Sequence, residues 1–198
     1  MATISILWIA WCLLHSALIS TTVTSRVQQL APPWPGLYKL AYVCFSLLSL
    51  LPLAWLTHRY PQAPIALPLW LRLFQILLFI YALILFIAGA RQYRLADFTG
   101  WKQWQQYRRT GTVAAAEPLF TGGILQHIRH PWYAGGLALL WALPLTDLNL
   151  SIRLILSIYI LAGTWLEERK LAIIHGERYR AYSRSTPRFF PWKYLMRL

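Results

Sequence analysis

The chain has 198 residues, of which 58% are hydrophobic and only 13% charged. A soluble globular domain is about half apolar and a quarter charged, and the apolar residues here stand in long runs, so an ordinary soluble fold is excluded. The net charge of +13 would indicate nucleic-acid binding in a soluble chain, but basic residues also collect in the cytoplasmic loops of membrane proteins. We therefore expect a membrane protein with lipids around it and no nucleic-acid partner.

Apolar segments long enough to enter a bilayer recur along the chain, and crossing takes about 20 mostly apolar residues. The first segment could be confused with a signal peptide, but it lacks a basic start and the polar pair His15-Ser16 interrupts it, so we interpret it as a retained span. The predicted spans are 4–19, 37–56, 69–90, 131–145 and 150–166. The predicted fold class is all-α, a polytopic membrane helical bundle of about five transmembrane helices.

The last two predicted spans differ from the others, because the fourth is short and a tight turn at 146–149 follows it. They are expected to form an antiparallel C-terminal helical hairpin whose first helix begins below the membrane surface, in protein rather than lipid. We expect one integral membrane domain over residues 1–198. Residues 1–95 would contribute three spans, and residues 96–198 an interfacial helix, the hairpin and a cytoplasmic cofactor-binding tail.

Aromatic and basic residues interleave between Asp97 and Arg109. Nucleic acid could explain such a pattern, but a helix lying at the membrane interface explains it better beside transmembrane spans.

The distribution of Lys and Arg predicts the orientation of the chain in the membrane. Basic residues gather in the first and third loops and in the tail, whereas only Arg59, Arg72 and Arg153 lie on the opposite side of the predicted spans. The bias predicts a multi-pass protein with a cytoplasmic C-terminus and, for five spans, an N-terminus outside.

The densest group of chemically useful residues lies between Gly122 and Gly136. Pro131 suits the first position of a helix, which puts Arg129 and His130 at the helix mouth, where free N–H groups favour an anionic group. Gly135-Gly136 would let a backbone or a flat ligand approach closely, and packing between helices is the simpler explanation.

Glu167-Glu168 are predicted to close the last span. Acidic residues at the membrane boundary are costly unless they are used or paired, so a functional role competes evenly with a local ion pair to Arg169 or Lys170. His15 shares a helical face with Trp8 and Trp11, and an intramembrane histidine is a functional hypothesis in itself.

A metal site is not expected, because His127 and His130 have no evident third ligand.

At these residues the sequence resembles the isoprenylcysteine carboxyl methyltransferases and related phospholipid methyltransferases. The similarity rests on Arg-His-Pro-Trp-Tyr at 129–133 with Gly135, on the Glu pair at 167–168, and on Gly176, Tyr179, Tyr182, Pro187 and Pro191 of the tail. One position departs from the signature, since Leu125 stands where the family has an aromatic residue. Weaker N-terminal motifs, at Trp11 to Ser16, Tyr38 to Leu40 and Asp97 to Gly100, resemble the branch of methanethiol S-methyltransferases and NnrU-type proteins.

The resemblance implies a methyltransferase of class EC 2.1.1 that uses S-adenosyl-L-methionine as cofactor and a small or lipophilic acceptor, a thiol or a carboxylate. The implied cofactor-binding residues are Arg129, His130, Pro131, Trp132, Tyr133, Glu167, Glu168 and Tyr179. A thiol acceptor must lose its proton, and His127 or His15 could assist. The alternative is a non-enzymatic membrane accessory protein of the NnrU type that handles haem, metal or nitrogen oxides.

Overall fold

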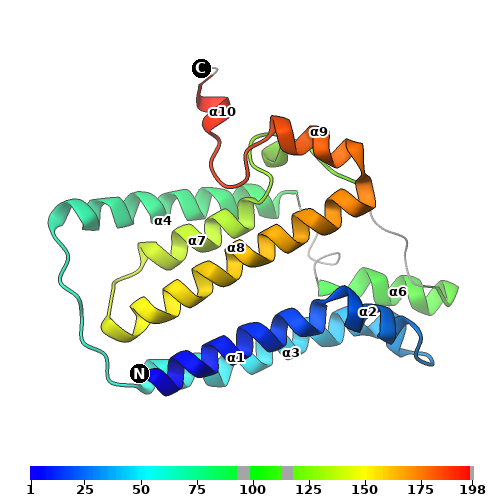
Figure 1. The fold of residues 1–198 in the computed structure, drawn as a ribbon, viewed down its shortest axis with the longest axis horizontal. Helices are drawn as coiled ribbons and strands as arrows, with labels where there is room; N and C mark the ends of the chain where they lie inside the picture. Colours follow the sequence, from blue (N-terminus) through cyan, green and yellow to red (C-terminus); the bar gives the residue numbers. More distant parts are fainter. Residues whose placement is uncertain (93–98, 113–117, 197–198) are drawn as a thin grey trace. The chain divides into compact units, whose positions relative to one another are not determined.

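The computed structural model describes residues 1–92, 99–112 and 118–196, and this part of the chain is helical with no strand beyond one isolated bridge (Figure 1). The helices in chain order are α1 (Ala2–Ile19), α2 (Thr21–Gln28), α3 (Trp34–Arg59), α4 (Leu69–Ala90), α6 (Trp101–Thr110), the 3-10 turn η1 (Gly123–Gln126), α7 (Pro131–Ala142), α8 (Asp147–His175), α9 (Glu177–Ser185) and α10 (Trp192–Leu195).

Four helices of the described residues are long and apolar enough to cross a membrane, namely α1, α3, α4 and α8. The all-α polytopic membrane fold class is therefore confirmed. The fourth predicted span is shorter than expected, because α7 has only 12 residues and is about 18 Å long, less than the roughly 30 Å of a bilayer's hydrocarbon core.

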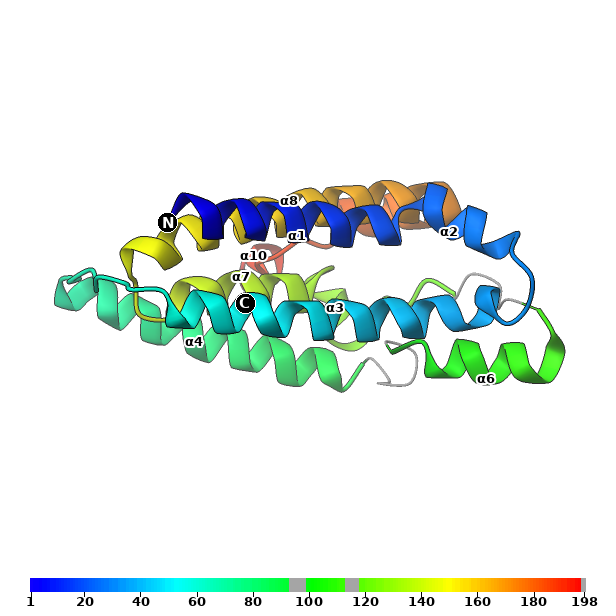
Figure 2. The same ribbon diagram turned by 90° about the horizontal axis from the view of Figure 1, so that it is seen from below.

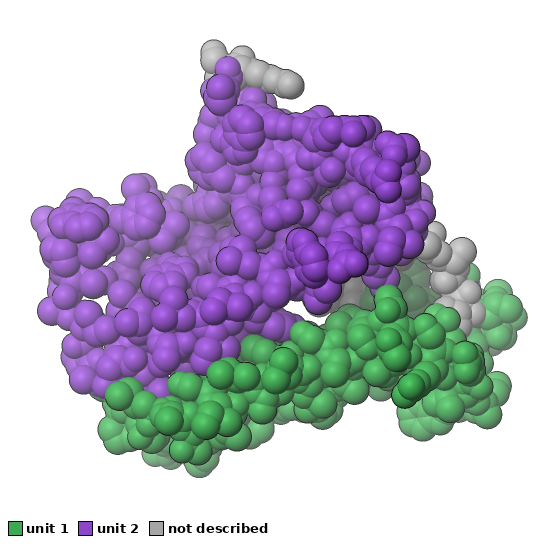
Figure 3. Space-filling view, viewed as in Figure 1, with its two compact units in different colours: residues 1–62, 93–115 green, residues 63–92, 116–198 purple. Residues whose placement is uncertain are grey.

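The helices group into two compact units, coloured separately in Figure 3. Unit 1 comprises residues 1–62 and 93–115, and unit 2 comprises residues 63–92 and 116–198. The third predicted span, α4, thus belongs with the C-terminal hairpin. The prediction of one membrane domain divided near residue 95 stays a prediction.

In unit 1, polar side chains join α1 to α3 at several levels. Trp8 donates to Thr57 over 3.0 Å, and Trp11 donates to Ser49 over 3.0 Å. Further along, the Tyr42 hydroxyl and His15 Nε2 are 2.5 Å apart. Interhelical hydrogen bonds of this kind hold apolar helices together where lipid offers no polar partner. The helix α6 packs on the first turns of α3, as Figure 2 shows.

In unit 2, α4, α7 and α8 run back and forth between two ends. At one end, the segment before α4 meets the turn before α8, through Ile65 N–H to Leu145 O (2.9 Å) and Asp147 N–H to Ala63 O (3.1 Å). At the other end, Gly89 near the end of α4 lies against Trp132 at the start of α7. Because α8 then returns to this second end, the start of α7, the later turns of α8 and the tail can meet there.

Glycine permits the close packing of α7 on α4. A Cβ on Gly135 would lie 3.3 Å from the Phe86 ring, and one on Gly89 would overlap the Trp132 ring. The packing interpretation of Gly135 is confirmed.

The turn predicted at 146–149 is wrong in detail, because these residues start α8. Thr146 and Asn149 form a capping box, in which each side chain bonds the backbone N–H of the other. The connection between α7 and α8 is the non-helical segment 143–145. The helices form the predicted hairpin and run in opposite directions in Figure 1. Glu167 and Glu168 also lie inside α8, which continues to His175, rather than closing it.

Candidate functional site

The Glu168 carboxylate is the centre of a charged cluster where the start of α7 meets the later part of α8. Its Oε1 accepts hydrogen bonds from Arg129 Nε (3.0 Å), Arg129 Nη2 (2.6 Å) and His130 Nε2 (3.1 Å). Its Oε2 accepts from Arg188 Nη2 at 2.5 Å. The local ion pair with Arg169 or Lys170, one of the two roles considered for the glutamate pair, is therefore not the one that Glu168 makes. Its partners are distant in the sequence.

Arg129 also fastens the tail to the start of α7. Its Nη1 donates to the carbonyl of Ser183 at 2.7 Å and to that of Thr186. The backbone continues this connection, since Arg129 N–H donates to Pro187 O (2.9 Å) and His130 N–H to Arg188 O (3.1 Å). The planar fork of a guanidinium suits such a branched junction. The tail is thereby held across the mouth of α7.

The cluster is mostly shielded from solvent, with side-chain exposures of 9% for Arg129, 12% for Glu168 and 6% for His130. Burial lowers the pKa of His130; the charges of Glu167 and Glu168 and the hydrogen bond from Glu168 oppose this, while the Arg129 charge adds to it. A neutral ring with its proton on Nε2 fits the hydrogen bond to Glu168. The bond to Glu168 raises the pKa of Arg188, whose side chain is 44% exposed.

Two buried oxygens beside the cluster make no hydrogen bond of normal geometry within the described residues. They are Oε2 of Glu167 and the hydroxyl of Tyr179. Tyr179 is 4% exposed, and burial, followed by the Glu168 charge, raises its pKa to about 12. Buried polar atoms are normally paired, so Oε2 of Glu167 is available to a polar ligand, whereas the Tyr179 hydroxyl interacts with Arg129.

The remaining predicted cofactor residues stand along the first turn of α7. Pro131 is its first residue and is buried. Trp132 packs against Gly89 of α4. The Tyr133 ring stacks on His130 with centroids 5.6 Å apart and is itself 40% exposed. This aromatic ring is therefore partly exposed beside the charged cluster.

The two histidines considered for catalysis lie in different units. His127 is in unit 2, where its ring meets Tyr194 edge-on at 4.3 Å. His15 is in unit 1, where it stacks on Trp11 at 4.9 Å and bonds Tyr42. Asp97 and Phe98 of the N-terminal motif lie outside the described residues. Among the described residues, no three His, Cys, Asp or Glu side chains are grouped so that they could hold a metal ion.

Sequence reasoning did not single out Arg188 or Phe189. Arg188 pairs with Glu168, and the Phe189 ring lies 6.5 Å from that of His130. Both lie between Pro187 and Pro191 of the tail motif. Their position inside this motif was the sequence feature that could have identified them. At Leu125, where the sequence departs from the signature, the backbone carbonyl accepts the Tyr182 hydroxyl at 2.5 Å, a bond that does not depend on the side chain.

The fold and the site define the chain as a helical membrane protein with a shielded ionic cluster at one end of unit 2. In sequence it is similar to methanethiol S-methyltransferases. It is 28% identical to the protein of that name from Crocosphaera subtropica over 158 residues, which cover 76% of this chain and 60% of the relative. No protein-family model matches the chain, and no solved structure matches it.

Shorter matches agree with this relationship. The methanethiol S-methyltransferase of Pseudomonas deceptionensis is 45% identical over 65 residues, 32% of this chain and 25% of the relative. Methanethiol S-methyltransferase 1 of Bradyrhizobium diazoefficiens is 36% identical over 81 residues, 40% of this chain and 28% of the relative. The chain is thus a relative of these proteins, which confirms the resemblance drawn from its motifs, and its matched part spans about 60% of the longest-matched relative.

Proposed function

We propose that the chain is a methyltransferase that moves a methyl group from S-adenosyl-L-methionine to a small thiol at the membrane. The observation that carries the proposal is the Glu168 cluster, which joins the start of α7, α8 and the tail at the residues of the methyltransferase motifs. Methanethiol is the acceptor in the names of the relatives, and it is the first acceptor to test here.

The residues around the cluster suit a ligand with an ammonium group, a carboxylate and a flat base. We assign the ammonium to Glu167, whose buried Oε2 has no protein partner of normal geometry in the described part of the chain. The half-exposed Arg188 would take the carboxylate. The partly exposed Tyr133 ring would receive the base, and the Tyr179 hydroxyl, which interacts with Arg129, would lie beside a sugar hydroxyl.

Arg129 and His130 were expected to bind the cofactor directly, and we propose a different task for them. Their side chains bond Glu168, and Arg129 also bonds the tail carbonyls. They are therefore positioning residues, which hold the tail and orient Glu168.

S-Adenosyl-L-methionine supplies a methyl group that is already activated on a sulfonium. A displacement of this kind needs aligned reactants and little water rather than a triad or a metal. The shielded cluster and the tail across α7 would supply both conditions. The acceptor thiol loses its proton before attack. His127 and His15 remain the candidate proton acceptors.

Calorimetry with S-adenosyl-L-methionine and the purified chain in detergent tests the assignment. Glu167→Gln should weaken binding at least tenfold while the melting temperature stays within about 2 °C, because its Oε2 bonds no described residue. Glu168→Gln and His130→Ala should weaken binding too. The matched control is Glu177→Gln on the exposed face of α9. Wild-type affinity in all three site variants would refute the site.

The activity is tested separately, by transfer of a radiolabelled methyl group to methanethiol. Cofactor binding without transfer to any thiol, carboxylate or lipid would contradict the reaction and leave a cofactor-binding protein. A Soret band or a stoichiometric metal in the purified protein, without cofactor binding, would favour the NnrU-type alternative.

We further propose that the site end of unit 2 faces the cytoplasm. The basic residues Arg178, Arg180, Arg184 and Lys193 at that end carry the argument, because positive charge marks cytoplasmic segments.

A further inference from the structure

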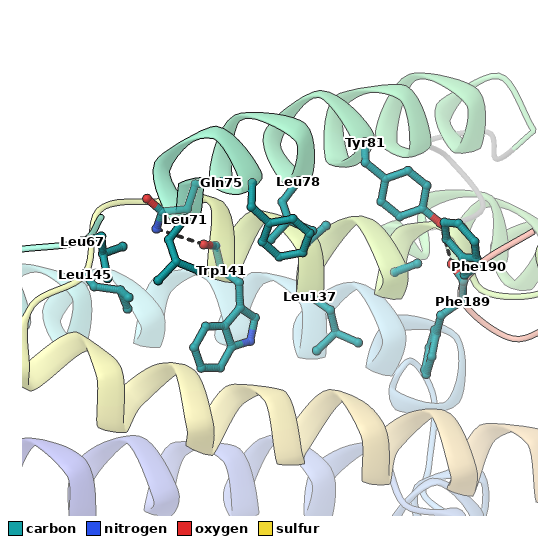
Figure 4. A pocket seen from close by; sticks show the side chains of 13 residues that line it. Leu67, Leu71, Gln75, Leu78, Tyr81, Leu137, Trp141, Leu145, Phe189 and Phe190 are labelled. Carbon is teal, nitrogen blue, oxygen red and sulfur yellow. Dashed lines mark hydrogen bonds between the residues drawn. The ribbon is translucent and has the colours of Figure 1, made fainter. Parts of the chain in front are cut away.

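An apolar groove of about 630 Å³ lies between α4 and α7 in unit 2 (Figure 4). Along α4 it extends from Leu71 to Tyr81, about 15 Å of helix. Leu137 and Trp141 of α7 line its other side, and Phe189 of the tail stands at the Tyr81 end. The relatives' acceptor, methanethiol, has two heavy atoms and would fill a small fraction of this space.

The groove is lined almost wholly by apolar side chains, so it offers little to a charged or strongly polar occupant. Its polar side chains, Gln75 and Tyr81, already donate to backbone carbonyls. Gln75 bonds Trp141 O (3.2 Å) and Leu143 O (2.8 Å), and Tyr81 bonds Phe189 O (2.7 Å). All other lining side chains are hydrocarbon or aromatic. A hydrocarbon chain is the ligand chemistry that these walls accept.

One end of the groove adjoins the candidate site. Phe189 lines the groove and also approaches His130, and its neighbour Arg188 pairs with Glu168. Ala134, another lining residue, is one helical turn after His130. An occupant whose chain lies along α4 would therefore present its head group at the Phe189 end, beside the ionic cluster.

We propose, resting on the proposed function, that the groove binds the alkyl chain of the acceptor, so that the preferred substrates are thiols with chains longer than methyl. In the transfer, the thiol first releases its proton to a base or water. The thiolate sulfur then forms a bond to the methyl carbon as the bond from that carbon to the donor sulfonium breaks. The products are an alkyl methyl thioether and the neutral thioether of the donor.

The test compares kcat/KM for methanethiol and 1-octanethiol in the purified chain with radiolabelled S-adenosyl-L-methionine. Wild type should prefer octanethiol at least tenfold. Leu78→Trp, which fills the groove, should lower the octanethiol-to-methanethiol ratio at least tenfold. The control Leu77→Trp adds the same bulk one residue away, on an exposed position that does not line the groove, and should keep both rates.

The control also separates binding in the groove from simple partition into detergent or lipid. Partition favours long thiols in every variant alike, so a ratio that is the same in wild type, Leu77→Trp and Leu78→Trp overturns the groove proposal while the methyltransferase remains. Failure to methylate any thiol overturns the proposed function and the groove proposal together.

A second measurement does not depend on turnover. An octyl methyl thioether carrying a terminal diazirine should, on illumination, label α4 and α7 residues that line the groove, and excess octyl methyl thioether should suppress this labelling. If Leu78→Trp does not fold, Leu71→Trp replaces it, with the exposed Leu73→Trp as its control. Labelling that the competitor does not reduce would show a lipid-facing surface and refute the groove as a binding site.

Discussion

A single carboxylate, Glu168, bonds three basic side chains in the site. Arg129 depends on it most, since its guanidinium is always charged and both groups are largely buried. Removing one partner of a buried pair leaves the other charge uncompensated, which typically costs about 3–5 kcal/mol.

Glu168→Gln is therefore expected to destabilise the purified chain by about 3 kcal/mol, or roughly 6–12 °C in melting temperature. Glu177→Gln removes an exposed partner of Arg180 and should cost less than about 1 kcal/mol. Thermal denaturation of the two variants in the same detergent compares them. Equal losses would mean that Glu168 is not the centre of a buried network.

His130 gives the site a pH dependence. Its pKa is lowered in the folded chain, chiefly by burial, so the unfolded chain takes up the proton first as pH falls. The stability that neutral His130 contributes is complete above its unfolded pKa of about 6.5 and is lost as pH falls below that value. Melting temperatures at pH 7.5 and 5.5 should differ less in His130→Gln than in wild type. The same difference in both would assign the effect to other groups.

At the scale of elements, glycine sets the distance between α4 and α7. Gly89→Ala would press a methyl group into the Trp132 ring and should destabilise the chain by about 1–3 kcal/mol. Gly163 of α8 has nothing within 4 Å among the described residues, so Gly163→Ala should instead stabilise the helix by up to about 1 kcal/mol. Thermal denaturation shows whether each substitution raises or lowers the stability of the chain. A stabilising Gly89→Ala would contradict the α4–α7 packing.

The tail is the other element whose position depends on a few bonds. Arg129 donates to two tail carbonyls and to Glu168, and lysine cannot reproduce this fork. Arg129→Lys should raise the rate of tryptic cleavage at Arg184 and Arg188 about tenfold or more, followed by mass spectrometry. The control Arg180→Lys changes an exposed residue of α9 and should leave the rate unchanged. Equal rates in both variants would show that Arg129 does not hold the tail.

At the scale of the whole molecule, the path of the chain in the membrane follows from where its helices begin. The segment before α4 bonds the start of α8, through Ile65 N–H to Leu145 O (2.9 Å) and Asp147 N–H to Ala63 O (3.1 Å), so both helices begin at the same end of unit 2. The chain therefore returns to this end between α4 and α8, through the short α7 and the residues that follow it.

This path predicts that residue 66 lies outside and residue 181 in the cytoplasm. In a chain with Cys12→Ser and Cys44→Ser, a membrane-impermeant maleimide should label Ala66→Cys in intact cells and Ala181→Cys only after permeabilisation. The opposite labelling pattern would reverse the proposed orientation, and labelling of both in intact cells would contradict a return across the membrane between α4 and α8.

Local chemistry let the sequence by itself determine the helical membrane class, the exact extent of α4 and the start of α7 at Pro131. The length of an apolar segment and the fixed φ of proline are local properties, so they can be recognised in the sequence without knowledge of the tertiary structure. The motif residues also indicated that the start of α7 and the later part of α8 would meet.

Only the tertiary structure decided how those residues are used. In the structure α8 continues past Glu168, and Glu168 pairs with Arg129 and Arg188. A groove lies between α4 and α7. These outcomes depend on partners 20 to 39 positions apart in the chain, and on volume left between helices. Neither long-range pairing nor unfilled space follows from local sequence, because both arise only when separate helices pack together.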